Sequence, residues 1–228
     1  MCMSFFFCNF AVGMTKIQTY WAKVSSEEKA NMWTHLLPLV ATIGGSCPLL
    51  QLANSMTEVV GVSLFLLGML LMFGSSTFYH AVTAPERKAR LRVLDHMCIY
   101  IMIAGSYSLM CLSVVGGWLG WSVFVFLWVA VLIGCISKMV ALGKYPKLSL
   151  ALFLAMGWVA LVIIVPLWRN MPHVAFGWAL AEGFFYTIGS YFYSKDEEHA
   201  YYHAVWHVFI ILGALSHTIA TILILKNI

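Results

Sequence analysis

The stretch HAYYHAVWHVFIILGALSHTIATILIL, residues 199–225, decides the fold class. It is apolar and long enough to supply the about 20 residues that a helix needs to cross a bilayer, yet it carries four histidines. His203 and His207 are four residues apart, which places both imidazoles on one face of a helix, one turn apart. The stretch therefore predicts a membrane-spanning helix with a pair of histidines near its start that is spaced to bind one metal ion.

The whole chain shares this apolar character. It has 228 residues, of which 62% are hydrophobic and 10% charged, and its mean hydropathy is +0.88. A water-soluble domain of this size needs more polar surface, so the composition indicates a polytopic membrane protein. The net charge of +4 is small, and no nucleic-acid partner is expected. The cysteines form no CxxC pair and are interpreted as small core residues: Cys2, Cys8, Cys47, Cys98, Cys111 and Cys135.

Seven apolar segments of spanning length predict an all-α, seven-transmembrane helix bundle. Short connections make consecutive helices antiparallel neighbours. Residues 1–32 are expected to form an N-terminal cytoplasmic segment and residues 33–228 the bundle. The opening MCMSFFFCNFAVGM lacks a basic start and a cleavage site, so it is not interpreted as a signal peptide, and translation from Met14 is an alternative. The segments are approximately 33–53, 58–81, 93–115, 118–142, 148–168, 174–193 and 200–225.

The lysines and arginines predict the orientation of this bundle. If the N-terminus is cytoplasmic, all of the 13 except Arg169 and Lys226 fall on the inside. The bias holds in each loop and follows the positive-inside rule. We therefore expect a cytoplasmic N-terminus, an outside C-terminus and a location in the cell membrane (plasma or inner membrane).

This orientation brings further polar residues to the depth of the histidine pair. His80 ends the second segment and Asp95 begins the third, both near the cytoplasmic face. Three neutral imidazoles with one open position are the usual ligands of catalytic zinc, so His80, His203 and His207 are the candidate Zn²⁺ ligands. Asp95 is the candidate to hold or deprotonate a zinc-activated water, and Ser76, one turn before His80, the candidate to assist. The competing interpretation of Asp95 is a helix N-terminal acid stabilised by the helix dipole and a nearby arginine.

The remaining histidines have simpler interpretations. His217 lies ten residues beyond His207, about 15 Å deeper along a helix, and is expected to be a packing residue. His35 has no obvious partner in the sequence, and His96 is adjacent to Asp95 but would point from another helix face. His173 and His199 lie in loops and are expected to be solvated.

Five motifs resemble, in order, those of the hemolysin III family, which belongs with the progestin and adipoQ receptors, including the adiponectin receptors. They are EEKANMWTH, SSTFYHAV, RVLDHMCIYIMIAGSY, EGFFYTIGSYFY and HAVWHVFIILGALSH. The similarity extends from about Glu27 to the end, and the length resembles the bacterial branch. One departure is visible, because many relatives continue IAGSY with Thr-Pro where this chain has Ser108 and Leu109. A missing proline is expected to straighten the third helix.

The resemblance implies seven helices with a cytoplasmic N-terminus, zinc on His80, His203 and His207, a water-linked Asp95 and an assisting Ser76. The similarity of this family to the alkaline ceramidases implies that the protein is a zinc-dependent hydrolase of a membrane lipid amide or ester. Two alternatives remain. One is a non-enzymatic regulator or receptor in which zinc only ties helices together. The other is the cytolytic activity that the family name implies, against which the lack of a continuous polar stripe argues weakly.

Overall fold

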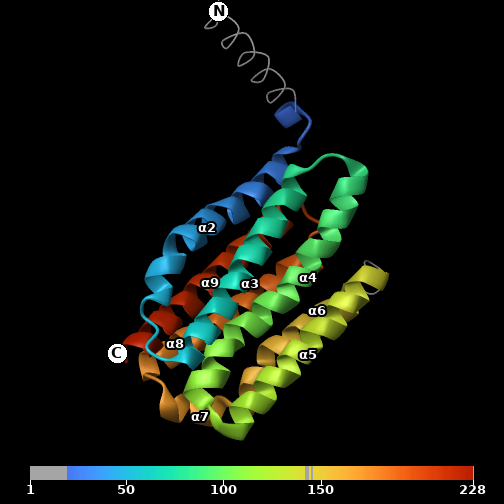
Figure 1. Ribbon diagram of the computed structural model, residues 1–228. Coiled ribbons are helices and arrows are strands. Elements are labelled where there is room, and N and C mark those ends of the chain that lie inside the picture. Colours follow the sequence, from blue (N-terminus) through green and yellow to red (C-terminus); the bar gives the residue numbers. More distant parts are fainter. Residues whose placement is uncertain (1–19, 142–143, 145, 228) are drawn as a thin grey trace, which may run out of the picture.

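The computed structural model describes residues 20–141, 144 and 146–227, and its regular elements in these ranges are all helices (Figure 1). The expectations about Cys2, Cys8 and a start at Met14 fall outside the described residues. The helices are α2 (Ser26–Leu50), α3 (Met56–Ala81), α4 (Pro85–Leu109) with a π-helical continuation (Met110–Val115), α5 (Gly117–Ala141), α6 (Pro146–Gly157) with a 3₁₀ turn (Trp158–Val162), α7 (Ile164–Asn170), α8 (His173–Ser194) and α9 (Tyr202–Lys226).

The helices confirm the all-α prediction and correspond in order to the expected segments. Five of them, α2, α3, α4 with its continuation, α5 and α9, are long and apolar enough to cross a membrane. Helices α6 and α7 add a sixth crossing when they are counted together as one broken span. The chain bends by 56° between them. The sequence predicted one helix over 148–168, so this bend is a difference. The sixth segment, α8, is helical but is not among the described helices that are long and apolar enough to cross a membrane.

Local sequence signals explain where the first helices begin. The Ser25 hydroxyl accepts the Glu28 backbone N–H at the start of α2. Ser55 and Glu58 form a reciprocal capping box at the start of α3, which satisfies two backbone donors that the helix leaves free. Pro85 occupies the first turn of α4, where its missing N–H costs nothing.

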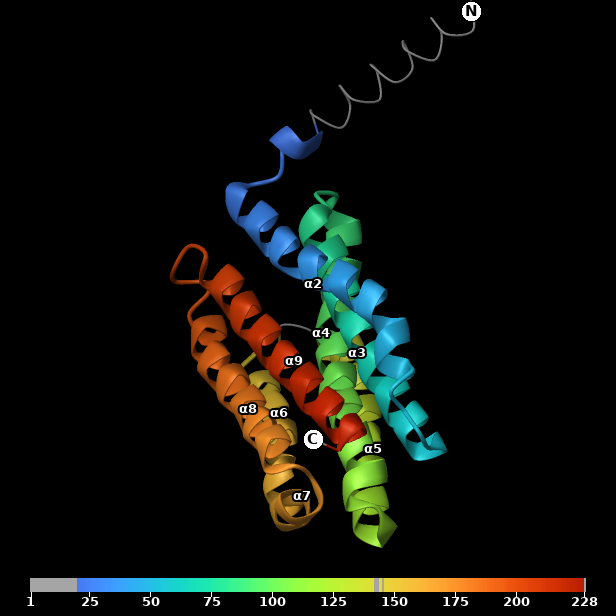
Figure 2. The same ribbon diagram turned by 90° about the vertical axis from the view of Figure 1, so that its left-hand side faces the viewer.

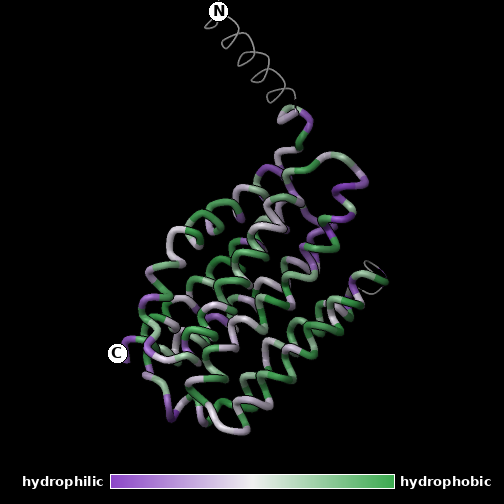
Figure 3. Tube along the Cα trace, in the orientation of Figure 1, coloured by the Kyte–Doolittle hydropathy of each residue, from purple (hydrophilic) through white to green (hydrophobic). Residues whose placement is uncertain are grey.

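The helices pack so that distant parts of the chain meet. Helix α3 forms a hairpin with α4, α2 packs against both α3 and α9, and α8 packs along α9. Helix α5 lies beside α4, while α6 contacts α4 and α8 (Figures 1 and 2). Hydrophilic residues gather near helix ends, conspicuously at the start of α4 (Figure 3). Since α2 and α9 are in contact, the first and last of the described membrane-length helices lie next to each other.

Glycines allow the close approach of α3 and α4. A Cβ at Gly105 would lie 2.6 Å from the Leu64 carbonyl oxygen, and one at Gly68 would lie 2.9 Å from the Met102 Cα atom. Small residues at helix interfaces allow backbones to approach closely, and packing of this kind is a main source of helix association in membranes. This hairpin fixes the end of α3 against the start of α4, where several candidate site residues lie.

A tight turn reverses the chain after α4. Gly116 and Gly117 both have positive φ, 59° and 55°, a region that residues with a Cβ rarely adopt. The helix before it continues through Ser108 and Leu109 into the π-helical turn without a break.

Two of the four described cysteines, Cys98 and Cys111, are buried as expected, and all four are free thiols. Cys47 is exposed on α2, so the core interpretation is wrong for that residue.

Replacement of Gly105 by alanine is expected to destabilise the protein by about 1–3 kcal/mol, because the added methyl group overpacks the α3–α4 interface. Thermal unfolding of the detergent-purified protein measures the loss. Gly44→Ala is the matched control, since a Cβ at Gly44 meets no atom within 4 Å. Equal unfolding temperatures for the two variants would contradict this account of the interface.

Candidate metal centre

Three histidines converge at the end of the bundle where α3 ends and α9 begins. His80 comes from α3, and His203 and His207 come from the first two turns of α9. The ring centroids of His203 and His207 are 4.6 Å apart, and each lies 5.2 Å from that of His80. One nitrogen from each ring lies within 4.8 Å of the other two. The predicted histidines are therefore brought together in an arrangement that can bind one metal ion.

A carboxylate holds the Nδ1 atom of two of these histidines. His80 Nδ1 lies 2.7 Å from Glu28 Oε2, and the other oxygen of Glu28 forms a 2.9 Å ion pair with Lys88. His203 Nδ1 lies 2.7 Å from Asp196 Oδ2, in the loop before α9. A carboxylate accepts, so each Nδ1 carries the proton and each Nε2 keeps its lone pair. Both Nε2 atoms are buried without a hydrogen-bond partner in the described part of the chain.

The third histidine has a neutral partner with the same consequence. His207 Nδ1 lies 3.2 Å from the Asn31 carbonyl oxygen and 2.9 Å from Thr34 Oγ1. The Thr34 hydroxyl donates its own proton to that carbonyl, at 2.8 Å, so the His207 Nδ1–H must be the donor to both oxygens. Bonds of this kind fix the tautomer and ring orientation of metal-binding histidines. All three rings are thus oriented with Nε2 as the free ligand atom.

Sequence reasoning did not find these outer partners. Glu28 lies in α2, 52 residues before His80, and its separation from His80 in the chain gives no local signal. Asp196 precedes His203 by only seven residues, but it lies in a turn, so helical spacing does not predict the contact. The EEKANMWTH motif was singled out, and it contains Glu28, Asn31 and Thr34. That motif was the available signal.

Asp95 and Ser76 lie at the same end of the bundle, as expected. Both are buried, with 8% and 1% of their surface exposed. Asp95 interacts electrostatically with His203 and with Ser76, although the Ser76 hydroxyl makes no hydrogen bond of regular geometry. Among the described residues, the group that can share a metal holds the three histidines and not Asp95. An acid beside the cluster, rather than in it, can accept a proton without occupying a coordination position.

His35 is the residue whose surroundings the sequence did not predict. Its ring stacks on His207, with centroids 3.7 Å apart and planes inclined by 16°, and its edge contact with Phe73 is at 5.3 Å. Both of its nitrogens are buried without a hydrogen-bond partner in the described ranges. The packing of α2 on α9 brings His35 into ring contact with the cluster, which the sequence did not predict.

The other histidines lie apart from the three-histidine group. His96 is outside it, as expected for a residue adjacent to Asp95. His173 and His199 are exposed as expected, but His173 is the first residue of α8 and not part of a loop. His217 is buried deeper in α9, and it makes a 2.7 Å contact with Glu182 of α8. It is thus a paired residue as well as a packed one.

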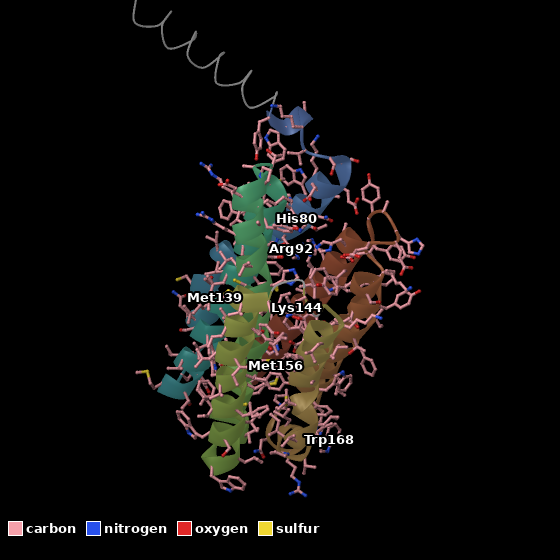
Figure 4. The ribbon with its side chains drawn as sticks, turned by 90° about the vertical axis from the view of Figure 1, so that its right-hand side faces the viewer. His80, Arg92, Met139, Lys144, Met156 and Trp168 are labelled. Carbon is pink, nitrogen blue, oxygen red and sulfur yellow. The ribbon has the colours of Figure 1, made fainter. Side chains whose placement is uncertain are left out.

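Polar groups mark the end of the bundle that holds the cluster. His80 and Arg92 lie together near one end, and Trp168 lies near the opposite end (Figure 4). A cavity begins beside the cluster, where Trp206 and Tyr193 lie 4.9 and 6.3 Å from the His203 ring. It extends to Glu182 and His217. The metal-binding arrangement is therefore next to an apolar cavity inside the bundle.

Comparison with known proteins places this architecture in a family. The family model described as Haemolysin-III related matches residues 24–218. The chain is 31% identical over 191 residues to the Hemolysin-3 homolog of Bacillus subtilis (strain 168), which covers 82% of this chain and 89% of the relative. It is 30% identical over 204 residues to Hemolysin-3 of Bacillus cereus, which covers 88% of this chain and 93% of the relative.

A mammalian protein is also similar. The chain is 28% identical over 204 residues to the human Monocyte to macrophage differentiation factor, with 84% of this chain and 81% of the relative covered. No solved structure matches the chain. The family match includes the three histidines of the cluster and their hydrogen-bond partners, and the chain belongs to the Haemolysin-III related family of membrane proteins.

Proposed function

We propose that this protein is a zinc-dependent hydrolase that cleaves an amide or ester bond of a membrane lipid. The observation that carries the proposal is the set of three imidazoles that can share a metal ion, each with its Nδ1 atom engaged, beside an apolar cavity. Three protein ligands leave a fourth position for water or substrate, which is the usual composition of a catalytic zinc site. Zinc would supply Lewis-acid activation of water and of the substrate carbonyl.

The proposed catalytic residues are Asp95 and Ser76. Asp95 takes the proton of the attacking water as oxygen adds to the carbonyl carbon, and it returns that proton to the departing nitrogen or oxygen as the C–N or C–O bond breaks. Ser76 donates a hydrogen bond that positions the water or the carbonyl oxygen. The products are a carboxylic acid and an amine or alcohol. Burial of both side chains keeps bulk water away from this proton transfer.

We further propose that the chain crosses the cell membrane seven times, with residues 1–32 and the centre on the cytoplasmic side. The α6–α7 pair would be the fifth crossing and α8 the sixth. The distribution of lysine and arginine supports this orientation, because Arg169 and Lys226 alone would lie outside. The protein's substrate would then reach the centre from the inner leaflet.

A structural role for zinc is the second candidate. The outer contacts favour it, since the Glu28–His80 pair joins α2 to α3 and the Asn31–His207 contact joins α2 to α9. A metal at this point would tie three helices together in a regulator or receptor without turnover. The names of the Bacillus relatives suggest lysis as a third activity, and lysis by metal-free protein would favour it over both zinc functions.

Detergent-purified protein is expected to contain about one zinc per chain, by mass spectrometry of the metal. His203→Ala and His207→Ala are each expected to lower the zinc content at least about tenfold, because two histidines hold the ion poorly. His199→Ala is the matched control, because His199 is an exposed histidine just before the same helix. Wild-type protein that takes up no metal, even after zinc is added, would contradict the proposal.

Removal of the outer carboxylates is expected to weaken zinc binding without removing a ligand. Glu28→Gln and Asp196→Asn should each lower zinc affinity by about 10–100-fold, since the imidazole loses its negatively charged partner. Competition with a zinc chelator measures the affinity. Glu198→Gln is the control from the same loop, because Glu198 pairs with Lys195. Affinities equal to that of the control would show that these contacts do not act on the metal.

Loss of the proposed base is expected to abolish turnover while zinc stays bound. Asp95→Asn and Asp95→Ala should lower the release of fatty acid from a fluorescent N-acyl sphingosine or a fluorescent diacylglycerol by about 10²–10⁴-fold. Ser76→Ala should have a smaller effect. Zinc content is measured on the same samples. Undiminished lipid turnover in zinc-loaded Asp95→Ala protein would remove Asp95 from the mechanism, and no turnover by wild type would favour the structural role.

A further inference from the structure

The buried pair of Glu182 and His217 lies deep in the bundle, away from the metal centre. His217 follows His207 by ten residues on α9, so it is about 15 Å further along the helix. Its Nδ1 atom lies 2.7 Å from Glu182 Oε2 of α8, and the two side chains are 1% and 12% exposed. Ionisable groups at membrane depth are costly and tend to mark functional sites. Nothing in the proposed reaction uses this pair.

Two polar atoms at this point lack a partner among the described residues. His217 Nε2 and the Tyr186 hydroxyl are buried and make no hydrogen bond within the described part of the chain. Phe65 covers the His217 ring at 4.4 Å, and the Tyr186 ring rests directly on Gly213 of α9. The two rings are therefore held in place by packing, while their polar atoms are left unsatisfied. Buried polar groups normally have partners, so a missing one calls for an explanation.

Both orphan residues, together with Glu182, line the cavity that begins beside the metal centre. The cavity encloses about 150 Å³, which is room for a segment of a hydrocarbon chain and not for a whole acyl chain. Its other walls are largely apolar and come mainly from α4, α6, α7 and α8, and include Met102, Phe153, Leu167 and Phe176. A hydrocarbon chain fits such walls, but a plain chain leaves His217 and Tyr186 without a hydrogen bond.

The hydrogen-bonding roles define the missing group. When a neutral His217 donates its Nδ1–H to the Glu182 carboxylate, Nε2 is an acceptor and needs a donor. The Tyr186 hydroxyl can donate, so it needs an acceptor. An alcohol hydroxyl on a hydrocarbon chain is both a donor and an acceptor, so its chemistry matches both needs. A ketone oxygen could accept from Tyr186 but would leave His217 unsatisfied.

We propose that Glu182, His217 and Tyr186 form a binding site for a hydroxyl group carried within the hydrocarbon chain of a lipid. His217 accepts from the hydroxyl, Tyr186 donates to it, and Glu182 fixes the His217 tautomer. The inference rests on the proposed function in one respect, that the carbonyl end of the chain lies at the histidine cluster. The hydroxyl would then lie well away from the carbonyl, near the middle of the chain. The lipid class selected is one with a hydroxylated acyl chain.

Binding of fatty acids to the zinc-loaded, full-length protein in phospholipid nanodiscs tests the proposal. The probes are octadecanoic acid and a series of monohydroxy octadecanoic acids with the hydroxyl at successive carbons. At least one mid-chain isomer is expected to bind about tenfold more tightly than octadecanoic acid, which corresponds to about 1.4 kcal/mol. Equal affinity for every member of the series would overturn the proposal and leave buried water as the partner of these atoms.

Three variants locate the preference. Tyr186→Phe and Glu182→Gln should each reduce the ratio between the affinities for the hydroxylated and the plain acid to about twofold or less. Tyr193→Phe is the matched control, because Tyr193 is another tyrosine of α8 that lines the same cavity near the metal centre. It should keep the preference. Loss of the preference in Tyr193→Phe, or its retention in Tyr186→Phe, would contradict the assignment.

The binding assay involves no turnover, so it separates this inference from the proposed hydrolase. A hydroxyl preference in a protein that hydrolyses no lipid would support the site and refute the reaction. Hydrolysis without any preference between hydroxylated and plain acyl chains would support the reaction and refute the site. Thermal unfolding of each variant confirms that the bundle is intact before its affinities are compared.

Discussion

The structure depends on one constraint, that a polar group taken into hydrocarbon must find its partner inside the protein. The backbone meets this constraint by folding into helices, and the histidines meet it through partners on neighbouring elements. Glu28 accepts from His80, Asp196 from His203, and the Asn31 carbonyl from His207. Each contact gives the buried Nδ1 atom a hydrogen-bond partner and leaves the Nε2 atom of the same ring free. The three histidines lie close enough together to share one metal ion. The clustering of three lone pairs thus follows from the way the burial cost is met.

Helix packing converts these pairings into a site. Glycines at the α3–α4 interface allow the two helices to pack closely along their length. The end of α3, with Ser76 and His80, therefore lies beside the start of α4, with Asp95. The contact of α2 with α9 adds His35, which stacks on His207. Small residues also allow α8 to approach α9 closely, which places Glu182 against His217. Close packing therefore determines which polar residues meet, at the centre and deeper in the bundle.

Much of this arrangement could be predicted from the sequence. The apolar segments predicted the helices, and the spacing of His203 and His207 predicted a pair on one face. The positive-inside rule brought His80 and Asp95 to the same depth. Glu28, His35 and Glu182 were not predicted as partners, because contacts between helices far apart in the chain leave no periodic signal. The bend between α6 and α7 was also missed, since hydropathy over 148–168 is continuous and the 3₁₀ turn carries no proline or glycine of its own.

The contact between the first and last described spans has a consequence for biogenesis. Translation delivers Glu28, Asn31 and Thr34 early, and His203 and His207 with the final helix. The ligand set is therefore incomplete until α9 has been inserted and has docked against α2, however long α3 has been in the membrane. A bound metal ion would therefore indicate that the helices from α2 to α9 have been inserted and have packed together. Truncated chains that lack α9 would retain only His80 of the three histidines and could not bind the metal ion at this point.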